Sequence, residues 1–564
     1  MANAQVSDQP DGRRTDGRRR DGSDGKPKGT RSRGRRPNNI GLIFEHFADR
    51  ETPVFHLDRP FDVAPEDGTR YTAGQLAALV ARLSAALHQS GLRKGDRLAI
   101  IKENHFDVVL LAAAAARIGA LPAMISSTIK AENLRIMMTR LRPRVLVSDP
   151  AALAAAERIG VKLVGPDVAI IAAGRAAAPA GVPTFDDMRD AEVPPADPVD
   201  DDEPMIATHT SGTTGVPKFV VHSAATTISV NTKLETAPIP RLSIRRDDTV
   251  AACFAFMHIR AITWTVAQLV RPPEKVVILA DPAPKGVIDT LSEHRATTLE
   301  ACPNLYQLWE GLTETHPQLF ERVRTYFSTF DAIHPSTVRK FLAVPRRRNP
   351  LWVQSWGQSE VGPVSIGVLT RRMVADDRGN ADNNVGWPVP FVTHFRVVDP
   401  RTRRRVKRGE EGLVLVRTRG RCLTYLGEHD RHQEKRWDGW WNTGDIGVRT
   451  RTGAIRILDR EVDLIPGMSG IELESLLLHR IDSATEAIVL GVPEGRPQPV
   501  LSTRDGELDP EVWRAATADL PELAEPAVIP WEEFPRTATW KVRRFELREQ
   551  ILGSDQTIGS GKWT

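Results

Sequence analysis

The chain has 564 residues, of which 41% are hydrophobic and 26% are charged. This is the composition of an ordinary soluble globular protein of two to four domains, large enough to bury a core. Its most apolar run, from Val108 to Ala116, reads VVLLAAAAA and is too short to cross a bilayer as a helix. The composition therefore predicts a buried helix there and no membrane partner.

The net charge of +4 is unevenly distributed along the chain. Residues 1–38 hold eleven Lys or Arg and five Asp, a charge of +6, so the remainder carries 4 − 6 = −2. The pI of about 9.0 therefore reflects this segment and not the folded body. Because the segment has almost no apolar residues, it is predicted to be a disordered basic tail. Its Arg runs could contact nucleic acid, but a solvated extension is the simpler interpretation, so nucleic acid is not an expected partner.

The number and spacing of the cysteines indicate the cellular compartment. Cys253, Cys302 and Cys422 are widely separated, and no pair has the spacing of metal ligands. A sparse, odd count is typical of a reduced protein, and the tail lacks the apolar stretch of a secretory signal. These features predict a cytoplasmic location.

Apolar patterns in the body alternate between helix and strand. Thr72 followed by Gln75 is typical of a capping box. The helix that it predicts has one apolar face, formed by Leu76, Leu79, Val80, Leu83 and Leu87. Short apolar runs predict buried strands at 97–101, 145–147, 168–171, 276–279 and 351–353. This alternation favours a layered α/β architecture with largely parallel sheets.

The pattern changes in the later part of the chain. Residues 393–398, 413–417 and 454–458 are strand-like with turns between them, which predicts a small β subdomain. Mixed α and β patterns return after it. The predicted fold is therefore α/β: a large N-terminal body of layered α/β subdomains with a small β subdomain over 39–459. A small mobile α+β C-terminal lid domain over 460–553 and a flexible tail over 554–564 would complete the chain.

The segment from Thr208 to Lys218, THTSGTTGVPK, has the composition of a phosphate-binding loop. Glycines let backbone N–H groups approach a phosphate closely, hydroxyl side chains donate hydrogen bonds, and lysine adds a point charge. The candidate binding residues are Thr210, Ser211, Gly212, Thr213, Thr214, Gly215 and Lys218. The segment is not a Walker loop, because the GxxxxGK(S/T) pattern is absent. A Ser/Thr/Gly-rich surface loop is the alternative.

Ser211 to Lys218 resemble the SGTTGxPK loop of the adenylate-forming superfamily of acyl-CoA synthetases, adenylation domains and luciferases. Further motifs follow in that family's order. WGQSE at 356–360 resembles the aromatic-Gly-x-Thr-Glu motif, with Ser for Thr, and NTGD at 442–445 resembles the TGD motif. Asp459 and Arg460 stand where the family has Gly-Arg, and PRTATWK at 535–541 resembles the catalytic-lysine motif. The resemblance covers about residues 40 to 550.

The resemblance implies roles around ATP and Mg²⁺. Asp445 and Arg460 would bind the ribose diol, and Asp331 would lie against adenine. Glu360 would hold Mg²⁺, a hard cation that favours carboxylate and phosphate oxygens. The nucleotide-binding set also includes Trp356, Gly357, Gln358 and Ser359.

Two further residues would act on the reacting groups. Lys541 would bridge the attacking carboxylate and the α-phosphate, offsetting charge that develops in the transition state. His258, in the segment Phe256 to His258, would lie at the acid pocket. Simpler alternatives are a turn residue for Asp445, a surface acid for Glu360, a solvated lysine for Lys541 and a buried structural histidine for His258. The segment EHDRH at 428–432 gives no complete set of metal ligands and is expected to be a solvated loop.

The sequence departs from the family after Arg460. Val462 replaces a polar hinge residue and Pro466 replaces a lysine. The loop that follows, before Glu472, is about four residues shorter than in the family. In the family this loop swings toward the active site for thioester formation. A β-branched valine is stiff, whereas a hinge must absorb large changes in φ and ψ. Adenylation is therefore expected to be intact, and thiol transfer is in doubt.

Taken together, the motifs predict an AMP-forming ligase that adenylates a small acid, releases pyrophosphate and transfers the activated group to an acceptor. On family frequency, the favoured acceptor is a thiol, of coenzyme A or a carrier. One alternative is an ATP-dependent diazotase, which activates nitrite and transfers it to an aryl amine. Another is a non-catalytic adenylate-binding protein. Lys218, Glu360, Asp445 and Lys541 are all intact, which argues against that last alternative.

Overall fold

A computed structural model describes residues 37–210, 216–331, 333–375, 384–460, 469–492, 495–537 and 539–553, without the side chains of Leu234 and Arg460. Both predicted tails, apart from residues 37 and 38, lie outside these residues. So do residues 461–468, which contain most of the predicted hinge and the start of the loop after it. Among the helices that are described, none is long and apolar enough to cross a membrane.

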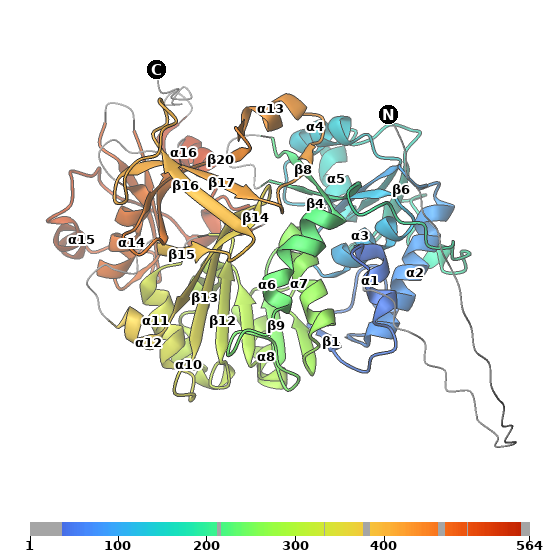
Figure 1. Ribbon diagram of the computed structural model, residues 1–564, viewed down its shortest axis with the longest axis horizontal. Coiled ribbons are helices and arrows are strands. Elements are labelled where there is room, and N and C mark those ends of the chain that lie inside the picture. Colours follow the sequence, from blue (N-terminus) through green and yellow to red (C-terminus); the bar gives the residue numbers. More distant parts are fainter. Residues whose placement is uncertain are drawn as a thin grey trace, which may run out of the picture. The chain divides into compact units, whose positions relative to one another are not determined.

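The first sheet has the strand order β18-β8-β7-β4-β3-β5-β6. Its strands from β7 to β6 are parallel, and β8 and β18 extend one edge in antiparallel fashion. The strands are β3 (Arg97–Lys102), β4 (Leu121–Ser126), β5 (Val145–Ser148), β6 (Ala169–Ala172), β7 (Pro204–His209), β8 (Phe219–Ser223) and β18 (Thr424–Tyr425). The neighbouring helices, blue to cyan in Figure 1, are α1 (Ile40–His46), α2 (Ala73–Gln89), α3 (Asp107–Arg117), α4 (Ala131–Leu141) and α5 (Pro150–Arg158).

Two of these helices follow directly from the sequence pattern. Thr72 Oγ1 accepts a hydrogen bond from the N–H of Gln75, and the Gln75 side chain accepts from the N–H of Thr72. This confirms the predicted capping box at the start of α2. Helix α3 is buried on all sides, since residues 108–116 are each at most 1% exposed. The apolar run is therefore a core helix, as predicted.

The second sheet begins with parallel strands and continues as an antiparallel extension. Strands β1, β10, β9, β11, β12 and β13 pair in parallel. The antiparallel order β14-β15-β21-β20-β17-β16 follows β13, and β2 pairs with β1 at the other edge. The parallel part comprises β1 (Val54–Leu57), β9 (Thr249–Cys253), β10 (Lys275–Ile278), β11 (Thr298–Ala301), β12 (Thr325–Thr329) and β13 (Leu351–Gln358). The remaining strands are β2 (Arg70–Tyr71), β14 (Gly362–Leu369), β15 (Asn384–Pro388), β16 (Thr393–Val398), β17 (Glu411–Thr418), β19 (Arg436–Trp437), β20 (Trp440–Arg449) and β21 (Ile455–Arg460).

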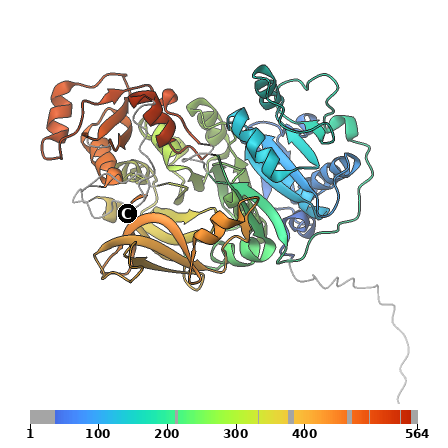
Figure 2. The same ribbon diagram turned by 90° about the horizontal axis from the view of Figure 1, so that it is seen from above.

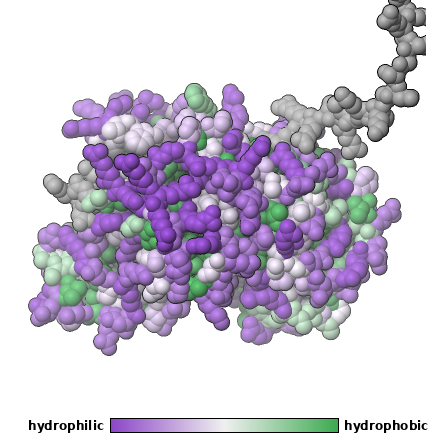
Figure 3. Space-filling model, turned by 90° about the horizontal axis from the view of Figure 1, so that it is seen from below, coloured by the Kyte–Doolittle hydropathy of each residue, from purple (hydrophilic) through white to green (hydrophobic). Residues whose placement is uncertain are grey.

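Helices accompany the parallel part of this sheet and lie beside its strands in Figures 1 and 2. They are the π-helical turn η3 (Ala225–Asn231), α6 (Lys233–Thr236), α7 (Ile259–Val270), α8 (Pro284–His294), α9 (Pro303–Leu308), α10 (Leu312–Thr315), α11 (Pro335–Ala343) and α12 (Arg371–Val374). Helix α13 (His429–Glu434) lies apart from them, next to β18 and β19. The largest buried cluster joins α1, α2, α3 and α7 to strands of both sheets. Apolar side chains on the face in Figure 3 are scattered among hydrophilic ones.

The C-terminal elements form a third sheet, β22-β23-β24, with its own apolar clusters. Successive residues of β22 alternate between two faces, as in any strand: Ala487 and Val489 join the cluster with α14, and Ile488 and Leu490 join the cluster with α16. The elements are α14 (Gly470–Arg480), β22 (Ala484–Leu490), β23 (Gln498–Thr503), α15 (Pro510–Thr517), β24 (Ala527–Val528) and α16 (Arg544–Leu552). The predicted α/β fold class is thereby confirmed.

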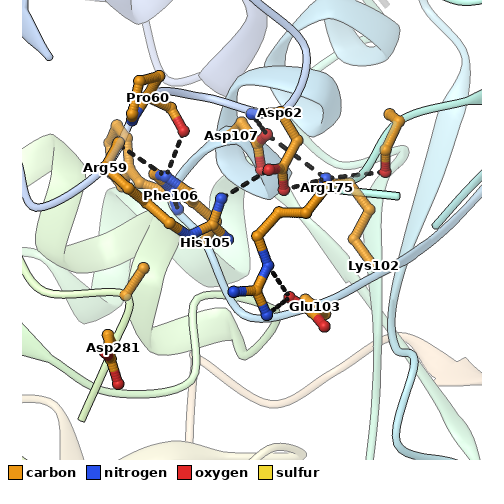
Figure 4. A network of polar contacts seen from close by, with 12 residues as sticks. Arg59, Pro60, Asp62, Lys102, Glu103, His105, Phe106, Asp107, Arg175 and Asp281 are labelled. Carbon is orange, nitrogen blue, oxygen red and sulfur yellow. Dashed lines mark hydrogen bonds and ion pairs between the residues drawn. The ribbon is translucent and has the colours of Figure 1, made fainter. Parts of the chain in front are cut away.

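A buried network of charged groups ties the loop after β1 to β3 and α3 (Figure 4). Lys102 is fully buried, and its Nζ lies 2.8 Å from Asp62 Oδ2 and 3.5 Å from Asp107 Oδ2. Arg59 pairs with the other oxygen of Asp62. Buried charges require such partners, because an unpaired one would be strongly destabilising. Asn104, two residues after Lys102, donates to Phe254 O and accepts from the N–H of Phe256. This corner of the first sheet therefore fixes the loop that leads to His258.

Candidate active site

One cavity of about 950 Å³ brings together most of the residues singled out from the sequence. This is the size of a site for a nucleotide or similar ligand. The predicted residues that line it are Thr210, Lys218, His258, Gly357, Gln358, Ser359, Glu360 and Lys541. Residues 211–215 of the predicted phosphate loop lie outside the described part of the chain. Trp356, Asp331 and Asp445 are neighbours of lining residues and are not themselves in the lining.

The ends of the phosphate loop are joined by backbone hydrogen bonds. The N–H of Thr210 donates to Lys218 O over 3.0 Å, and the N–H of Lys218 donates to Thr210 Oγ1 over 3.1 Å. This pairing continues the antiparallel ladder between β7 and β8. The sheet therefore presents both ends of residues 210–218 at the cavity.

His209 fixes the end of β7 just before this loop. Its Nε2 lies 3.2 Å from the backbone N–H of Ser126 and accepts a hydrogen bond from it. Nδ1 therefore carries the ring proton and donates to Thr210 O over 2.8 Å. Burial lowers the pKa of His209, so the ring stays neutral.

Lys218 and Glu360 meet around the Tyr425 ring. Lys218 Nζ lies 5.3 Å from the centre of the ring, and the Tyr425 hydroxyl donates to Glu360 Oε1 over 2.6 Å. Burial lowers the pKa of Lys218, and the negative charge of Glu360 opposes this shift. Arg431 and Lys435 line the same cavity. This end, here called the phosphate end, thus brings the cationic side chains of Lys218, Arg431 and Lys435 near the carboxylate of Glu360.

The segment that supplies Arg431 is helical. Residues 429–434 form α13, so the expected solvated loop is wrong. Glu428 at its start pairs with both Arg431 and Arg140, whose guanidinium lies 2.9 Å away. Among the residues that the structure describes, no group of three or more His, Cys, Asp or Glu side chains could hold a metal ion.

Gln358 connects the WGQSE segment to the NTGD segment. Its Nε2 donates to Thr443 O and to Asp445 Oδ2, each over 2.8 Å. Asp445 is 3% exposed and faces Arg460 across the β20–β21 ladder. Thr443 and Gly444 line the cavity. Asp445 therefore lies directly behind the cavity wall, where it positions Gln358.

His258 stands at the middle of the cavity as the N-cap of α7. Its Nδ1 accepts a hydrogen bond from the N–H of Arg260 over 3.1 Å, so a neutral ring carries its proton on Nε2. That atom lies 3.1 Å from Ser359 Oγ. Burial, aided by His209 and Lys541, lowers the pKa of His258 to about 3. His222 donates from Nε2 to Ser359 O over 2.7 Å, so two histidines hold this serine.

The C-terminal lysine motif reaches the same cavity. Lys541 N–H donates to Thr537 Oγ1, and the N–H of Thr537 donates to Lys541 O. Lys541 Nζ lies 3.7 Å from Asp331 Oδ1. Trp540, which stands where the family usually has glycine, adopts a φ of 64°, a conformation that costs a non-glycine residue free energy. Its ring stacks on Trp531 and packs against the large core cluster.

The opposite end of the cavity, here called the inner end, contains a charged group that sequence reasoning missed. Arg260 donates from Nε and Nη2 to the two oxygens of Glu300, over 2.7 and 2.8 Å, and from Nη1 to Glu235 over 2.5 Å. All three residues line the cavity. The sequence signal that could have identified Arg260 is its position, two residues after the predicted site residue His258. No pattern in the sequence links it to Glu235 or Glu300.

A model of the AMP-binding enzyme family matches residues 45–426. The chain is 37% identical over 549 residues to 3-amino-2-hydroxy-4-methoxybenzoate diazotase of Streptomyces cremeus, an alignment that covers 92% of this chain and 97% of the relative. It is 28% identical to the 4-hydroxybenzoate–CoA/benzoate–CoA ligase of Rhodopseudomonas palustris, over 91% of this chain and 95% of that one.

Solved structures share the fold. The anthranilate CoA ligase AuaEII in complex with anthranoyl-AMP superimposes with a TM-score of 0.74 at 20% identity, covering 91% of this chain and 97% of that one. The chain therefore belongs to the AMP-binding enzyme family. This confirms the resemblance to adenylate-forming enzymes and the prediction of an AMP-forming ligase.

Proposed function

We propose that this protein activates nitrite with ATP and transfers the nitroso group to an aryl amine, forming a diazo product. In the first step a nitrite oxygen attacks the α-phosphorus, the bond from that phosphorus to the bridging oxygen breaks, and pyrophosphate leaves. In the second step the amine nitrogen attacks the nitroso nitrogen. AMP leaves and keeps the oxygen that linked the nitroso nitrogen to phosphorus. One amine hydrogen departs as a proton and the other leaves with the nitroso oxygen as hydroxide, so the balance is one water.

The phosphate end supports binding of the nucleotide. Lys218, Arg431 and Lys435 supply positive charge where phosphates would lie. Thr210 and Lys218 are hydrogen-bonded to each other at the cavity. One oxygen of Glu360 accepts from Tyr425, which leaves the other for Mg²⁺. A single carboxylate suits this ion, because Mg²⁺ takes most of its ligands from phosphate and water. The ion would neutralise phosphate charge during the transfer.

Lys541 and His258 would act on the reacting groups. Lys541 would stabilise the charge that develops between the attacking oxygen and the α-phosphate. Its backbone N–H donates to Thr537, and its Nζ lies near Asp331. His258 stays neutral at working pH because of its lowered pKa. Its ring therefore would shape the site and orient Ser359 without adding a charge to it.

An aryl amine as the acceptor is supported by the relative with 37% identity, whose name is that of a diazotase acting on an aminobenzoate. That identity extends over nearly the whole of both chains and exceeds the 28% found with the aryl-CoA ligase of Rhodopseudomonas palustris. Several described residues that line the same cavity are aromatic or aliphatic and could pack against an aromatic ring. They are Met257, Trp264, Phe327, Phe330 and Val353. The observation that carries the proposal is one cavity that joins a cationic phosphate end to a region with apolar walls.

The test is analysis of products by mass spectrometry. The protein would be incubated with ATP, Mg²⁺, ¹⁵N-nitrite and 3-amino-2-hydroxy-4-methoxybenzoate. We expect AMP, pyrophosphate and a diazo product that carries one ¹⁵N. Omitting nitrite should abolish both the product and AMP formation. Formation of ADP, or of AMP with a thioester only when coenzyme A is added, would overturn the proposal.

Coenzyme A as acceptor is the second candidate, and the alignment with aryl-CoA ligases over nine-tenths of the chain favours it. In the family, the thioester step requires rotation of the C-terminal domain. Here that rotation would break contacts to the body: Asn304 donates to Glu486, and Trp540 packs against the core. A parallel reaction with benzoate and coenzyme A would reveal this activity as a thioester.

A further inference from the structure

The inner end of the cavity carries two carboxyl groups for one guanidinium. Glu235 comes from α6, Arg260 from the first turn of α7 and Glu300 from β11. All three come from separate elements of the body, and each lines the cavity. Such a group is costly to bury, and it adds little stability compared with apolar residues of the same size. Its place in the cavity wall therefore calls for an explanation beyond folding.

Four of the five N–H groups of Arg260 are engaged by its own partners, so it is poorly suited to bind a ligand carboxylate in bidentate fashion. Its Nε and Nη2 are engaged by Glu300, and its Nη1 by Glu235 and Thr263. Only 17% of its side chain is exposed. A carboxylate placed here would also face the two glutamates. Arg260 is therefore not a binding group for the carboxylate of a ligand.

Glu235 is the member of the group that remains available to a ligand. Its side chain is 26% exposed, against 3% for Glu300, and one oxygen, Oε1, accepts from Arg260. Burial raises the pKa of Glu235, and Arg260 opposes this. A carboxylate in this setting is a strong hydrogen-bond acceptor. An N–H or O–H group of a ligand is its natural partner.

Neighbouring polar atoms also lack partners. Gln268 Oε1 and Thr298 Oγ1 are buried, line the cavity and have no hydrogen-bond partner within the part of the chain that the structure describes. Gln268 lies on α7, two turns after Arg260, and Thr298 lies on the same face of β11 as Glu300. Buried polar groups are seldom left unpaired. The inner end therefore offers several polar atoms to a bound molecule.

We propose that Glu235, held by Arg260, recognises a hydrogen-bond-donating substituent, amino or hydroxyl, on the aryl substrate and so determines which rings enter the cavity. The apolar walls would hold the ring, and Trp264 lies between Arg260 and Gln268 in α7. This inference rests on the proposed function for the identity of the ring as an acceptor. Glu235 is thus a specificity-determining residue.

Binding of paired probes tests the inference without turnover. Each isomer of aminophenol would be compared with the corresponding methoxyaniline by calorimetry, and aniline with toluene. The first pairs report recognition of a hydroxyl and the last pair recognition of the amine. We expect at least one donor-bearing probe to bind ~10-fold more tightly than its partner, and Glu235→Gln to remove most of that preference, because a neutral acceptor forms the weaker bond.

The matched control is Glu474→Gln. Glu474 is also a buried glutamate paired with an arginine, Arg544, over 2.7 Å, but it lies in the C-terminal part and does not line the cavity. Its variant should keep the full preference of the wild type. Equal binding of donor and non-donor probes by the wild type would overturn the inference, as would a preference that survives in Glu235→Gln. Failure of the proposed function would show separately, as absence of diazo product despite selective binding.

Discussion

The two ends of the cavity are built in different ways. The phosphate end draws on short continuous segments, since Thr210, Val216 and Lys218 line it from one stretch and residues 357–360 line it from another. The inner end takes single residues, Glu235, Arg260 and Glu300, from three separate elements. The first kind of site leaves a pattern in the sequence. The second kind exists only after folding.

Their charges differ as well. The phosphate end holds Lys218, Arg431 and Lys435 around Glu360, whereas the inner end holds two carboxyl groups around Arg260. A cation-rich end suits a polyphosphate, and a carboxylate-rich end suits a donor. Under the proposed function, this difference would give each substrate its own end of the cavity.

The largest effect is expected at the inner end, from Arg260→Met. Without the guanidinium, Glu235 and Glu300 would be buried without a counter-charge. Removing one partner of a buried ion pair typically costs about 3–5 kcal/mol, so we expect a loss of that size in the free energy of unfolding, measured with urea. Arg260→Lys keeps the charge and should lose less. Unchanged stability in Arg260→Met would show that these carboxyl groups have ready access to water.

At the phosphate end, Lys541→Ala should act on rate instead of stability. Loss of a preorganised charge typically slows a reaction by ~10²-fold or more, and we expect this in the release of pyrophosphate with ATP and nitrite. The melting temperature should stay close to that of the wild type, because the Lys541–Asp331 separation is 3.7 Å, a long ion pair. Lys340→Ala, which breaks a 2.5 Å pair with Glu310 away from the cavity, is the control and should retain the wild-type rate. Wild-type pyrophosphate release by Lys541→Ala would remove this lysine from the mechanism.

A smaller effect is expected from Tyr425→Phe. The Tyr425 hydroxyl holds Glu360 in place over 2.6 Å, and loss of such a supporting hydrogen bond typically costs 10–100-fold in metal affinity or activity. The Mg²⁺ concentration for half-maximal pyrophosphate release should rise ~10-fold. An unchanged Mg²⁺ requirement would mean that Glu360 does not depend on this bond.

Sequence patterns identified the elements and the phosphate end for physical reasons. The capping box at Thr72 and the apolar run in α3 act locally, so the sequence alone predicts them. The position of Asp445 behind the wall depends on its bond to Gln358, a residue 87 positions away. The segment that carries Arg431 is expected to be a solvated loop, but it forms helix α13, whose buried residue is His432. Its polar sequence has no apolar period that would predict a helix. Tertiary contacts of this kind leave no local signal.

The last prediction concerns His258, which stands between the two ends. Its pKa of about 3 in the folded protein lies below the ordinary 6.5. Above pH 6.5 the ring is neutral in both folded and unfolded chains, so it adds no pH dependence. Between pH 6.5 and 3 the unfolded chain takes up a proton that the folded protein does not, so falling pH destabilises the fold.

His258→Asn keeps an N-cap for α7 but removes this titration. Relative to the wild type, the variant should therefore gain about 1.4 kcal/mol of unfolding free energy between pH 7.5 and 5.5, since one pH unit below the unfolded pKa corresponds to about 1.36 kcal/mol. Urea titrations at the two pH values measure this gain. If the difference in unfolding free energy between variant and wild type is the same at both pH values, the folded protein protonates His258 readily. His258 would then add a positive charge to the cavity at low pH.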